Sequence, residues 1–155
     1  MTAFNKIVVQ GCPPSREAKV ASDGTITPGD LIERKSTDEM KVHATAGGTV
    51  GCKYFAVENL PVGGEISDAY AVGSIVQFVH AQAGDLINAR ILDGDNIVIG
   101  DKLESGGNGR LRKLVADTSA GTIKPGAIIA EAREAKDMSS SALIDGTGRC
   151  LVEII

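Results

Sequence analysis

Residues 105–115, SGGNGRLRKLV, combine the residue types of a phosphate-binding loop: three glycines, then three basic side chains. Glycines let backbone N–H groups approach a phosphate, and lysine or arginine would neutralise its charge. The spacing matches neither common motif. The Lys-Ser/Thr pair of a P-loop is missing, and Gly106, Gly107 and Gly109 do not fit the Gly-x-Gly-x-x-Gly of a dinucleotide site. We therefore predict a hairpin tip at Gly107–Gly109, where glycine and asparagine tolerate positive φ angles.

Other groups that could do chemistry lack suitable neighbours in the sequence. Asp93 and Asp95 begin like a calcium loop but lack its later ligands, which favours a hairpin turn. His43 and His80 lie in predicted strands, and no Gly-x-Ser-x-Gly nucleophile motif accompanies them, so we interpret both as structural. We expect no catalytic, cofactor-binding or metal-binding residues, and no enzymatic activity.

The three cysteines, Cys12, Cys52 and Cys150, are far apart and have no Cys-x-x-Cys or Cys/His spacing. Structural zinc sites need such spacing, so this arrangement argues against one. We predict free and mostly buried thiols in a reducing compartment.

Bulk properties narrow the classes of partner. The chain has 155 residues, of which 20 are acidic and 16 basic, giving a net charge of -4. A DNA-binding surface needs a basic stripe to displace counterions, and only Arg110, Arg112 and Lys113 cluster, so we expect no nucleic-acid partner. The sequence has no apolar run of about 18 residues and no signal peptide, which predicts cytoplasmic synthesis and no membrane partner.

Composition and spacing favour an all-β protein with little helix. The 19 glycines are dispersed between short apolar runs, and the core must be built from aliphatic side chains because aromatics make up only 3%. Extended segments are expected at Leu31–Glu33, Met40–Gly47, Cys52–Leu60, Ser74–Ala81, Leu86–Leu92, Ile97–Ser105, Ala127–Ala135 and Arg149–Ile155.

One internal repeat points to the way in which these strands are connected. DGTITPGDLIE (Asp23–Glu33) recurs as AGTIKPGAIIA (Ala120–Ala130), and Gly-Asp pairs recur at Asp30, Asp85 and Asp101. Small closed sheets use glycine at such sharp corners. Two copies are too few for a solenoid, so we predict a small β-barrel domain over residues 23–155.

Residues 1–22 are predicted to form an extended N-terminal arm. Phe4–Gly11 has the composition of a strand, but Pro13 and Pro14 cannot donate to a ladder and force an extended backbone. The arm could lie on a partner surface. Alternatively, it could close the chain's own barrel.

The segments DGTITPGDLIER, VHATAGG, AGTIKPGAIIAEAREA and GTGRCLVEII together resemble the head decoration (cement) proteins of tailed bacteriophages. The resemblance covers roughly residues 20–155 as a pattern. It implies a small β-barrel or β-tulip-like fold that forms a homo-oligomer, with a trimer favoured and a dimer possible. It also implies binding to the major capsid protein on the exterior of the virion after synthesis in the host cytoplasm.

The resemblance further implies a function for the arm, which would add a strand to the shell and help to stabilise the expanded head. The residues expected to contact the capsid are Phe4, Ile7, Val8, Val9, Pro13 and Pro14.

Two other classes of function stay open. The chain could be a trimeric β-barrel enzyme or ligand-binding protein, similar to a nucleotide hydrolase with sites between subunits. Its candidate site residues would then be Asp85, Arg90 and Arg110. The chain could also be another structural part of a virion, such as a tail or fibre module.

Overall fold

The predicted all-β class is confirmed by the computed structural model, which describes residues 4–115, 126–139 and 148–155. These residues form thirteen strands and one three-residue 3-10 turn, η1 (Leu60–Val62). No helix in this described part is long and apolar enough to span a membrane. The strands are β1 (Val8–Gln10), β2 (Ser15–Lys19), β3 (Leu31–Arg34), β4 (Met40–Val42), β5 (Tyr54–Ala56), β6 (Ile75–His80), β7 (Leu86–Arg90), β8 (Asn96–Ile97), β9 (Lys102–Ser105), β10 (Leu111–Lys113), β11 (Ala130–Ala132), β12 (Lys136–Asp137) and β13 (Arg149–Ile154).

The N-terminal half forms a closed sheet, here called the first barrel (residues 15–80). Its five strands follow the order β2-β6-β5-β3-β4, and each neighbouring pair is antiparallel. A parallel bridge between Val20 and Met40 then joins the two edges of the sheet. The N–H of Ala21 donates to the carbonyl of Met40 at 2.8 Å, which supports this closure.

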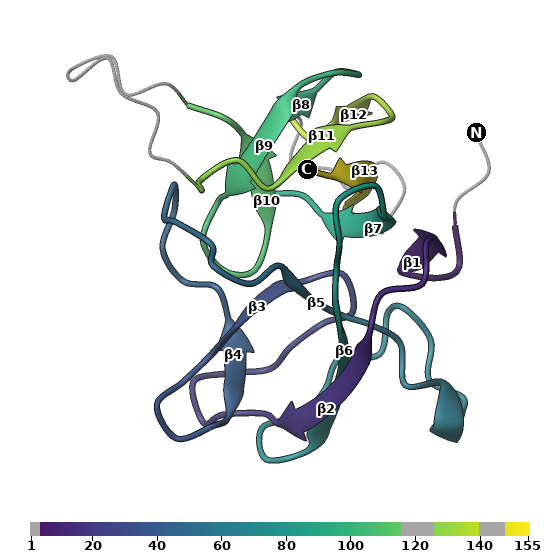
Figure 1. Cartoon of the computed structure of the whole chain (residues 1–155), viewed down its shortest axis with the longest axis vertical. Coiled ribbons are helices and arrows are strands. Elements are labelled where there is room, and N and C mark those ends of the chain that lie inside the picture. Colours follow the sequence, from purple (N-terminus) through teal and green to yellow (C-terminus); the bar gives the residue numbers. More distant parts are fainter. Residues whose placement is uncertain (1–3, 116–125, 140–147) are drawn as a thin grey trace.

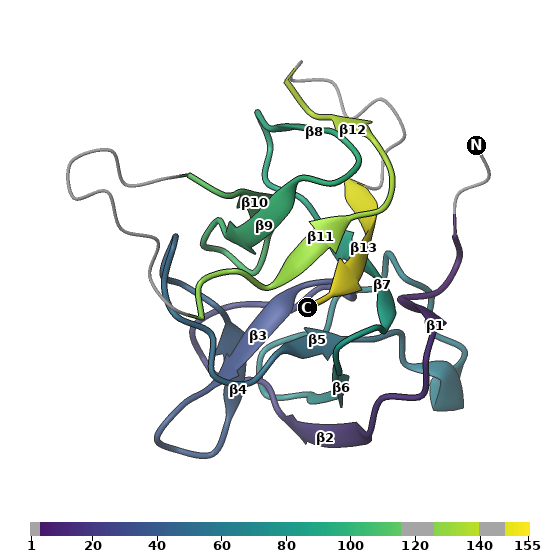
Figure 2. The same ribbon diagram turned by 45° about the horizontal axis from the view of Figure 1, so that its top comes forward.

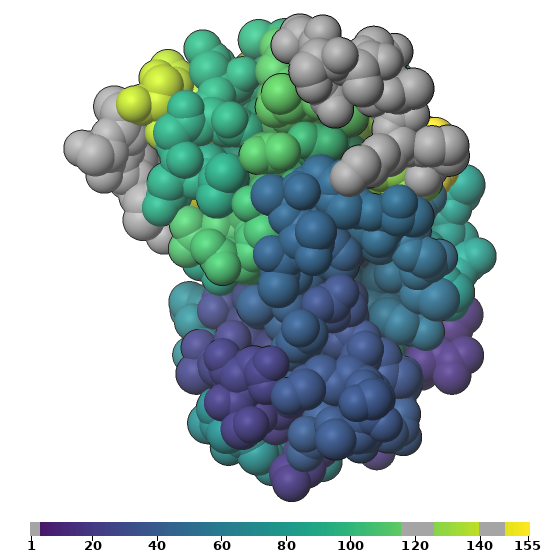
Figure 3. Space-filling model, turned by 90° about the vertical axis from the view of Figure 1, so that its left-hand side faces the viewer, coloured from purple at the N-terminus to yellow at the C-terminus, as the bar shows by residue number. Residues whose placement is uncertain are grey.

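The C-terminal half closes in the same way into the second barrel (residues 86–155). Its strands follow the order β7-β13-β11-β9-β10. A parallel bridge from Ile91, directly after β7, to Leu111 in β10 completes the ring. In Figure 1 the first barrel occupies the lower half of the molecule and the second barrel the upper half. The side view in Figure 3 likewise places the green surface of the second barrel above the blue and purple surface of the first.

The strands of residues 23–155 thus close into two rings, where one barrel was expected, while the division of the chain into an arm and a single domain stays a prediction. The sharp turn at Gln82–Asp85 separates β6 from β7, and each half closes its own ring with five short strands. The two barrels are nevertheless packed together. Alternate residues of a strand point to opposite faces, and β3 uses both: Ile32 lies in the core of the first barrel, and Leu31 in the cluster that fills the second barrel and the junction.

The repeated Gly-Asp corners are confirmed at all three positions, Asp30, Asp85 and Asp101. In each corner the aspartate N–H donates to the carbonyl three residues earlier, at 3.0, 3.0 and 3.1 Å. Its carboxylate accepts the N–H of that same earlier residue, at 2.8, 2.7 and 2.9 Å. The preceding glycine has φ of 94°, 95° or 91°, which a residue with a Cβ adopts only with strain. Each corner leads directly into a strand.

The longer repeat is described only in its first copy, because residues 120–125 lie outside the described residues. The hairpin tip at Gly107–Gly109 is confirmed: it joins β9 to β10, and Asn108 has a φ of 55°. The segment Ile97–Ser105 is two strands rather than one, since the Asp101 corner interrupts it. Asp93 and Asp95 lie in a turn, but not in a hairpin, because β7 pairs with β13 and β8 with β12.

Candidate functional site

The N-terminal segment is the first candidate site, and both of its strands pair within the chain: β2 belongs to the first barrel, and β1 lies at the outer edge of the sheet of the second barrel. β1 pairs with β7 of the second barrel, and β2 pairs with β6 of the first barrel along its whole length. The segment therefore crosses from one barrel to the other, as Figure 2 shows at its right and lower edges. Pro13 and Pro14 lie at the crossing, where the Pro14 carbonyl accepts the His80 N–H at 3.0 Å.

One of the six predicted contact residues is misplaced for that function. Ile7 is 0% exposed and belongs to the cluster at the junction. Its N–H donates to the Glu58 carboxylate at 3.2 Å, and its carbonyl accepts the Asn88 N–H at 2.7 Å. An apolar side chain at the end of a paired strand is drawn into the core, so Ile7 stabilises the fold itself and offers no surface.

The other five residues are accessible. Pro14 is exposed, and four others are partly exposed: Phe4, Val8, Val9 and Pro13. β1 also stands at the end of its sheet order, so one of its backbone edges has no neighbouring strand among the described residues. Contact between these residues and a capsid stays a prediction.

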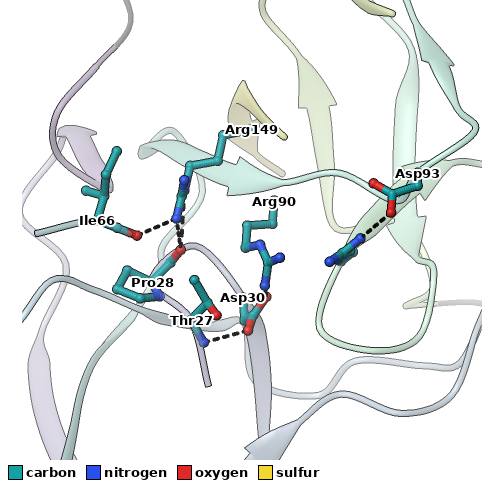
Figure 4. A network of polar contacts seen from close by, with 8 residues as sticks. Thr27, Pro28, Asp30, Ile66, Arg90, Asp93 and Arg149 are labelled. Carbon is teal, nitrogen blue, oxygen red and sulfur yellow. Dashed lines mark hydrogen bonds and ion pairs between the residues drawn. The ribbon is translucent and has the colours of Figure 1, made fainter. Parts of the chain in front are cut away.

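The second candidate site is a polar network between the barrels, drawn in Figure 4. Asp30, in the first Gly-Asp corner, is 2% exposed and accepts the N–H of Thr27. Its other carboxylate oxygen lies 2.9 Å from Nη1 of Arg90 at the end of β7. Burial raises the pKa of Asp30 above 3.8, while the Arg90 charge and the Thr27 N–H favour the ionised form.

Arg149 extends this network from β13. It is 5% exposed and donates to the Pro28 carbonyl at 2.8 Å and to the Ile66 carbonyl. Burial, and then the nearby Arg90 charge, lower the pKa of its guanidinium. Arg149 thus ties the second barrel to two loops of the first. Sequence reasoning missed it, because an isolated arginine in an apolar strand carries no motif.

The three residues of the enzyme hypothesis each have a different partner. Asp85 is 8% exposed, and its carboxylate holds its own corner by accepting the Gln82 N–H. Arg90 pairs with Asp30, and Arg110 pairs with Asp93 at 2.9 Å. These contacts hold loops and strands in place.

His43 takes part in a buried contact that resembles catalytic chemistry. Its Nδ1 lies 2.7 Å from the Ser105 hydroxyl, and its Nε2 lies 3.6 Å from the Glu33 carboxylate. Ser105 is 0% exposed, however, and its hydroxyl also accepts the Gly107 N–H at 3.3 Å. A substrate has no access to such a hydroxyl, so the contact joins β9 to the segment after β4, as a structural histidine would.

The cysteines differ from the prediction. Cys12 and Cys52 are exposed, and only Cys150 is buried. Burial in β13 raises the pKa of the Cys150 thiol to about 12, which keeps it protonated and unreactive. The prediction failed because Cys12 and Cys52 lie in loops, where apolar character alone does not bring burial.

The buried polar side chains of the described ranges are all hydrogen-bonded. Within residues 4–115, 126–139 and 148–155, each buried side-chain nitrogen or oxygen has a hydrogen-bond partner. The same residues contain no group of three or more His, Cys, Asp or Glu side chains that could hold a metal ion.

Comparison with known proteins gives a similarity in structure but not in sequence family. No protein-family model matches the sequence. No curated protein matches it significantly either. Among solved structures, the chain is similar to the N base of head fiber gp8.5 of bacteriophage phi29. The two chains share a fold. The match has a TM-score of 0.56 at 13% sequence identity and covers 93% of this chain and 95% of the other.

Proposed function

We propose that this chain is a structural protein of a bacteriophage virion and that it binds the outer surface of the major capsid shell. The observation that carries the proposal is the fold shared with a head-fiber base over nearly the whole length of both chains. The proposal also agrees with the sequence resemblance to head decoration proteins, which rests on other evidence.

The site offers a physical basis for such binding. β1 is a short edge strand held on a rigid barrel, so a segment of the shell could extend the sheet without ordering new structure in this chain. Phe4, Val8 and Val9 are partly exposed and would give that contact its apolar component. Each contact would be small, and assembly as a homo-oligomer, a trimer or a dimer, would raise the overall strength through avidity.

The experiment is sedimentation of the purified protein with expanded, undecorated heads. Wild-type protein should bind to saturation, and Val9→Asp should weaken binding because it places a charge on the exposed part of β1. Ile99→Asp, on the distant turn before β9, is the control and should bind like wild type. A protein that never sediments with heads, or a Val9→Asp variant that binds normally, would contradict this placement.

A second function within the virion is favoured by the similar structure, because that protein is a head-fiber base. A cement protein stabilises the shell itself, whereas a fibre base would only anchor another module to it. Heating decorated and bare heads separates the two. A cement protein raises the temperature at which heads release DNA, and a fibre base leaves it unchanged.

A further inference from the structure

An apolar ridge projects from the side of the first barrel. η1 has the sequence Leu-Pro-Val, and none of its side chains is buried. Leu60 is 70% exposed and Val62 is 76% exposed, the two highest values among the large exposed hydrophobic residues of the described chain. Figure 1 shows η1 standing out at the lower right, away from the barrel strands.

The backbone of this ridge is held in one conformation. The N–H groups of Val62 and Gly64 both donate to the Asn59 carbonyl, at 3.2 and 2.9 Å. Gly63 has a φ of 73° and donates to the Leu60 carbonyl at 3.0 Å. Ordering these residues costs conformational entropy, and no burial of their own side chains offsets it. Such a ridge is typical of a surface whose burial comes from a partner.

A groove runs between η1 and the loop that precedes β6. It has a volume of about 470 Å³, and both Val62 and Ile75 line it. Tyr70 lines it and is only 6% exposed, because its hydroxyl donates to the Val57 carbonyl at 2.7 Å. Ile75 and its neighbour Val72 are each 50% exposed. Val62, Tyr70 and Ile75 thus give the groove its apolar part, and Asn59, Asp68 and Ser74 give it a polar part.

The charged side chains nearest to the groove are mainly acidic. The sequence has no lysine or arginine between Lys53 and Arg90, while Asp68 lines the groove and Glu65 is exposed beside it. Lys19 lies opposite Ile75 in the strand register, but its ammonium group lies 3.3 Å from the Glu39 carboxylate, which offsets its charge. Two such acidic surfaces repel each other, and nucleic acid would be repelled too.

We propose that this groove and the adjoining ridge dock a segment of another protein, with an apolar centre that covers Leu60, Val62 and Ile75 and with flanking lysines or arginines. The apolar centre would bury the ridge, and the basic flanks would complement Glu65 and Asp68. This proposal needs neither β1 nor a capsid partner.

The test uses ¹⁵N-labelled protein and three synthetic peptides observed by NMR. The first has a Leu-Val-Leu centre with two lysines on each side, the second has glutamates in place of the lysines, and the third has a serine centre between lysines. The first peptide should shift amide signals of residues 59–64 and 68–75 saturably, and this binding should weaken with added salt. The other two should bind at least about tenfold more weakly.

Variants locate the contact. Val62→Ser and Leu60→Ser should each weaken binding of the first peptide, while Ile99→Ser, which removes an equally exposed apolar side chain elsewhere, should leave it unchanged. The unshifted signals of each variant report whether it remains folded. Equal binding of the lysine and glutamate peptides, or shifts confined to other residues, would overturn the proposal. So would self-association of the wild type that Val62→Ser abolishes, because the occupant would then be a second copy.

Discussion

Asp30 of the first barrel and Arg90 of the second form an ion pair across the junction, with 2.9 Å between the carboxylate and the guanidinium. A backbone hydrogen bond also joins the two barrels at this point, because the Arg90 N–H donates to the Gly29 carbonyl at 3.0 Å. The glycine and the aspartate of one corner thus both hold β7. The two barrels are joined by directed polar contacts as well as by apolar packing.

This pair can be tested with a matched control inside the same chain. Asp30→Asn keeps an acceptor for the Thr27 N–H but leaves Arg90 without its counter-charge. Asp85→Asn makes the same change in an equivalent corner that depends on a backbone N–H rather than on an ion pair. We expect Asp30→Asn to lower the free energy of unfolding by about 1–3 kcal/mol more than Asp85→Asn, measured by urea denaturation. Equal losses would show that the ion pair contributes nothing.

Ile7 provides a test of how the N-terminal segment is placed. Because its side chain is completely buried, Ile7→Ala should cost about 2–4 kcal/mol of unfolding free energy. Val9→Ala, two residues later and partly exposed, should cost less than about 1 kcal/mol. Denaturant unfolding of both variants distinguishes this placement from a free arm, in which the two substitutions would be equally mild.

Gly11 is required where β1 passes the Asp85 corner. A Cβ at Gly11 would lie 1.9 Å from a carboxylate oxygen of Asp85, and the φ of 110° adds strain. Gly84→Ala is the control, since its φ is 95° and no atom lies within 4 Å of the added Cβ. Gly84→Ala should cost about 1–2 kcal/mol, and Gly11→Ala clearly more. Thermal unfolding compares them, and equal melting temperatures would mean that the close approach is absent.

The acid side of the stability curve should depend on Glu131. A hydrogen bond from Lys102 lowers the pKa of Glu131 below its ordinary value of 4.5. The unfolded chain then binds the proton more tightly, so this stabilisation is present above pH 4.5 and is lost as pH falls through the lower folded pKa. Glu131→Gln should reduce stability at neutral pH and flatten this part of the curve. Lys102→Met should flatten it as well, whereas Lys6→Met, on the exposed N-terminal segment, should not.

Thiol reactivity should divide the cysteines into two classes. Cys12 and Cys52 are exposed and should react with a disulfide reagent in the native protein. Cys150, whose pKa burial raises to about 12, should react only after unfolding. Counting the thiols that react at pH 8, first without and then with denaturant, checks this. The Cys150→Ala variant should lose only the thiol that reacts after unfolding. Three fast thiols in the native protein would contradict the burial of β13.

The local features of this fold were predictable where glycine fixes the backbone. Glycine and asparagine tolerate positive φ angles, and these residue types can be recognised in the sequence. They predict the corners before β3, β7 and β9 and the tip between β9 and β10. The closure of two rings was not predictable in this way. It depends on parallel bridges at Val20–Met40 and Ile91–Leu111, which join residues far apart in the chain without any local signal.

The same distinction applies to the candidate sites. The sequence shows that Ile7 is apolar, but an apolar residue suits a core and a partner surface equally well, and only its place beside β7 decides between them. The structural roles of Arg149 and Asp30 depend on long-range contacts. Arg149 contacts Pro28, 121 residues away in the sequence, and Asp30 contacts Arg90, 60 residues away. The exposed ridge at η1 was not predicted from the sequence, because an apolar Leu-Pro-Val segment is equally compatible with the end of a buried strand.

β1 and β13 flank β7 on its two sides and run in the same direction, since each is antiparallel to β7. Val8 and Val152 both face Ile87, so the two strands begin and end at opposite ends of the same ladder. A mechanical load applied between them acts along the strands. It shears the hydrogen bonds of each ladder together and does not open them one at a time. An anchor at one end of the chain could thus transmit tension to the other end without opening either ring.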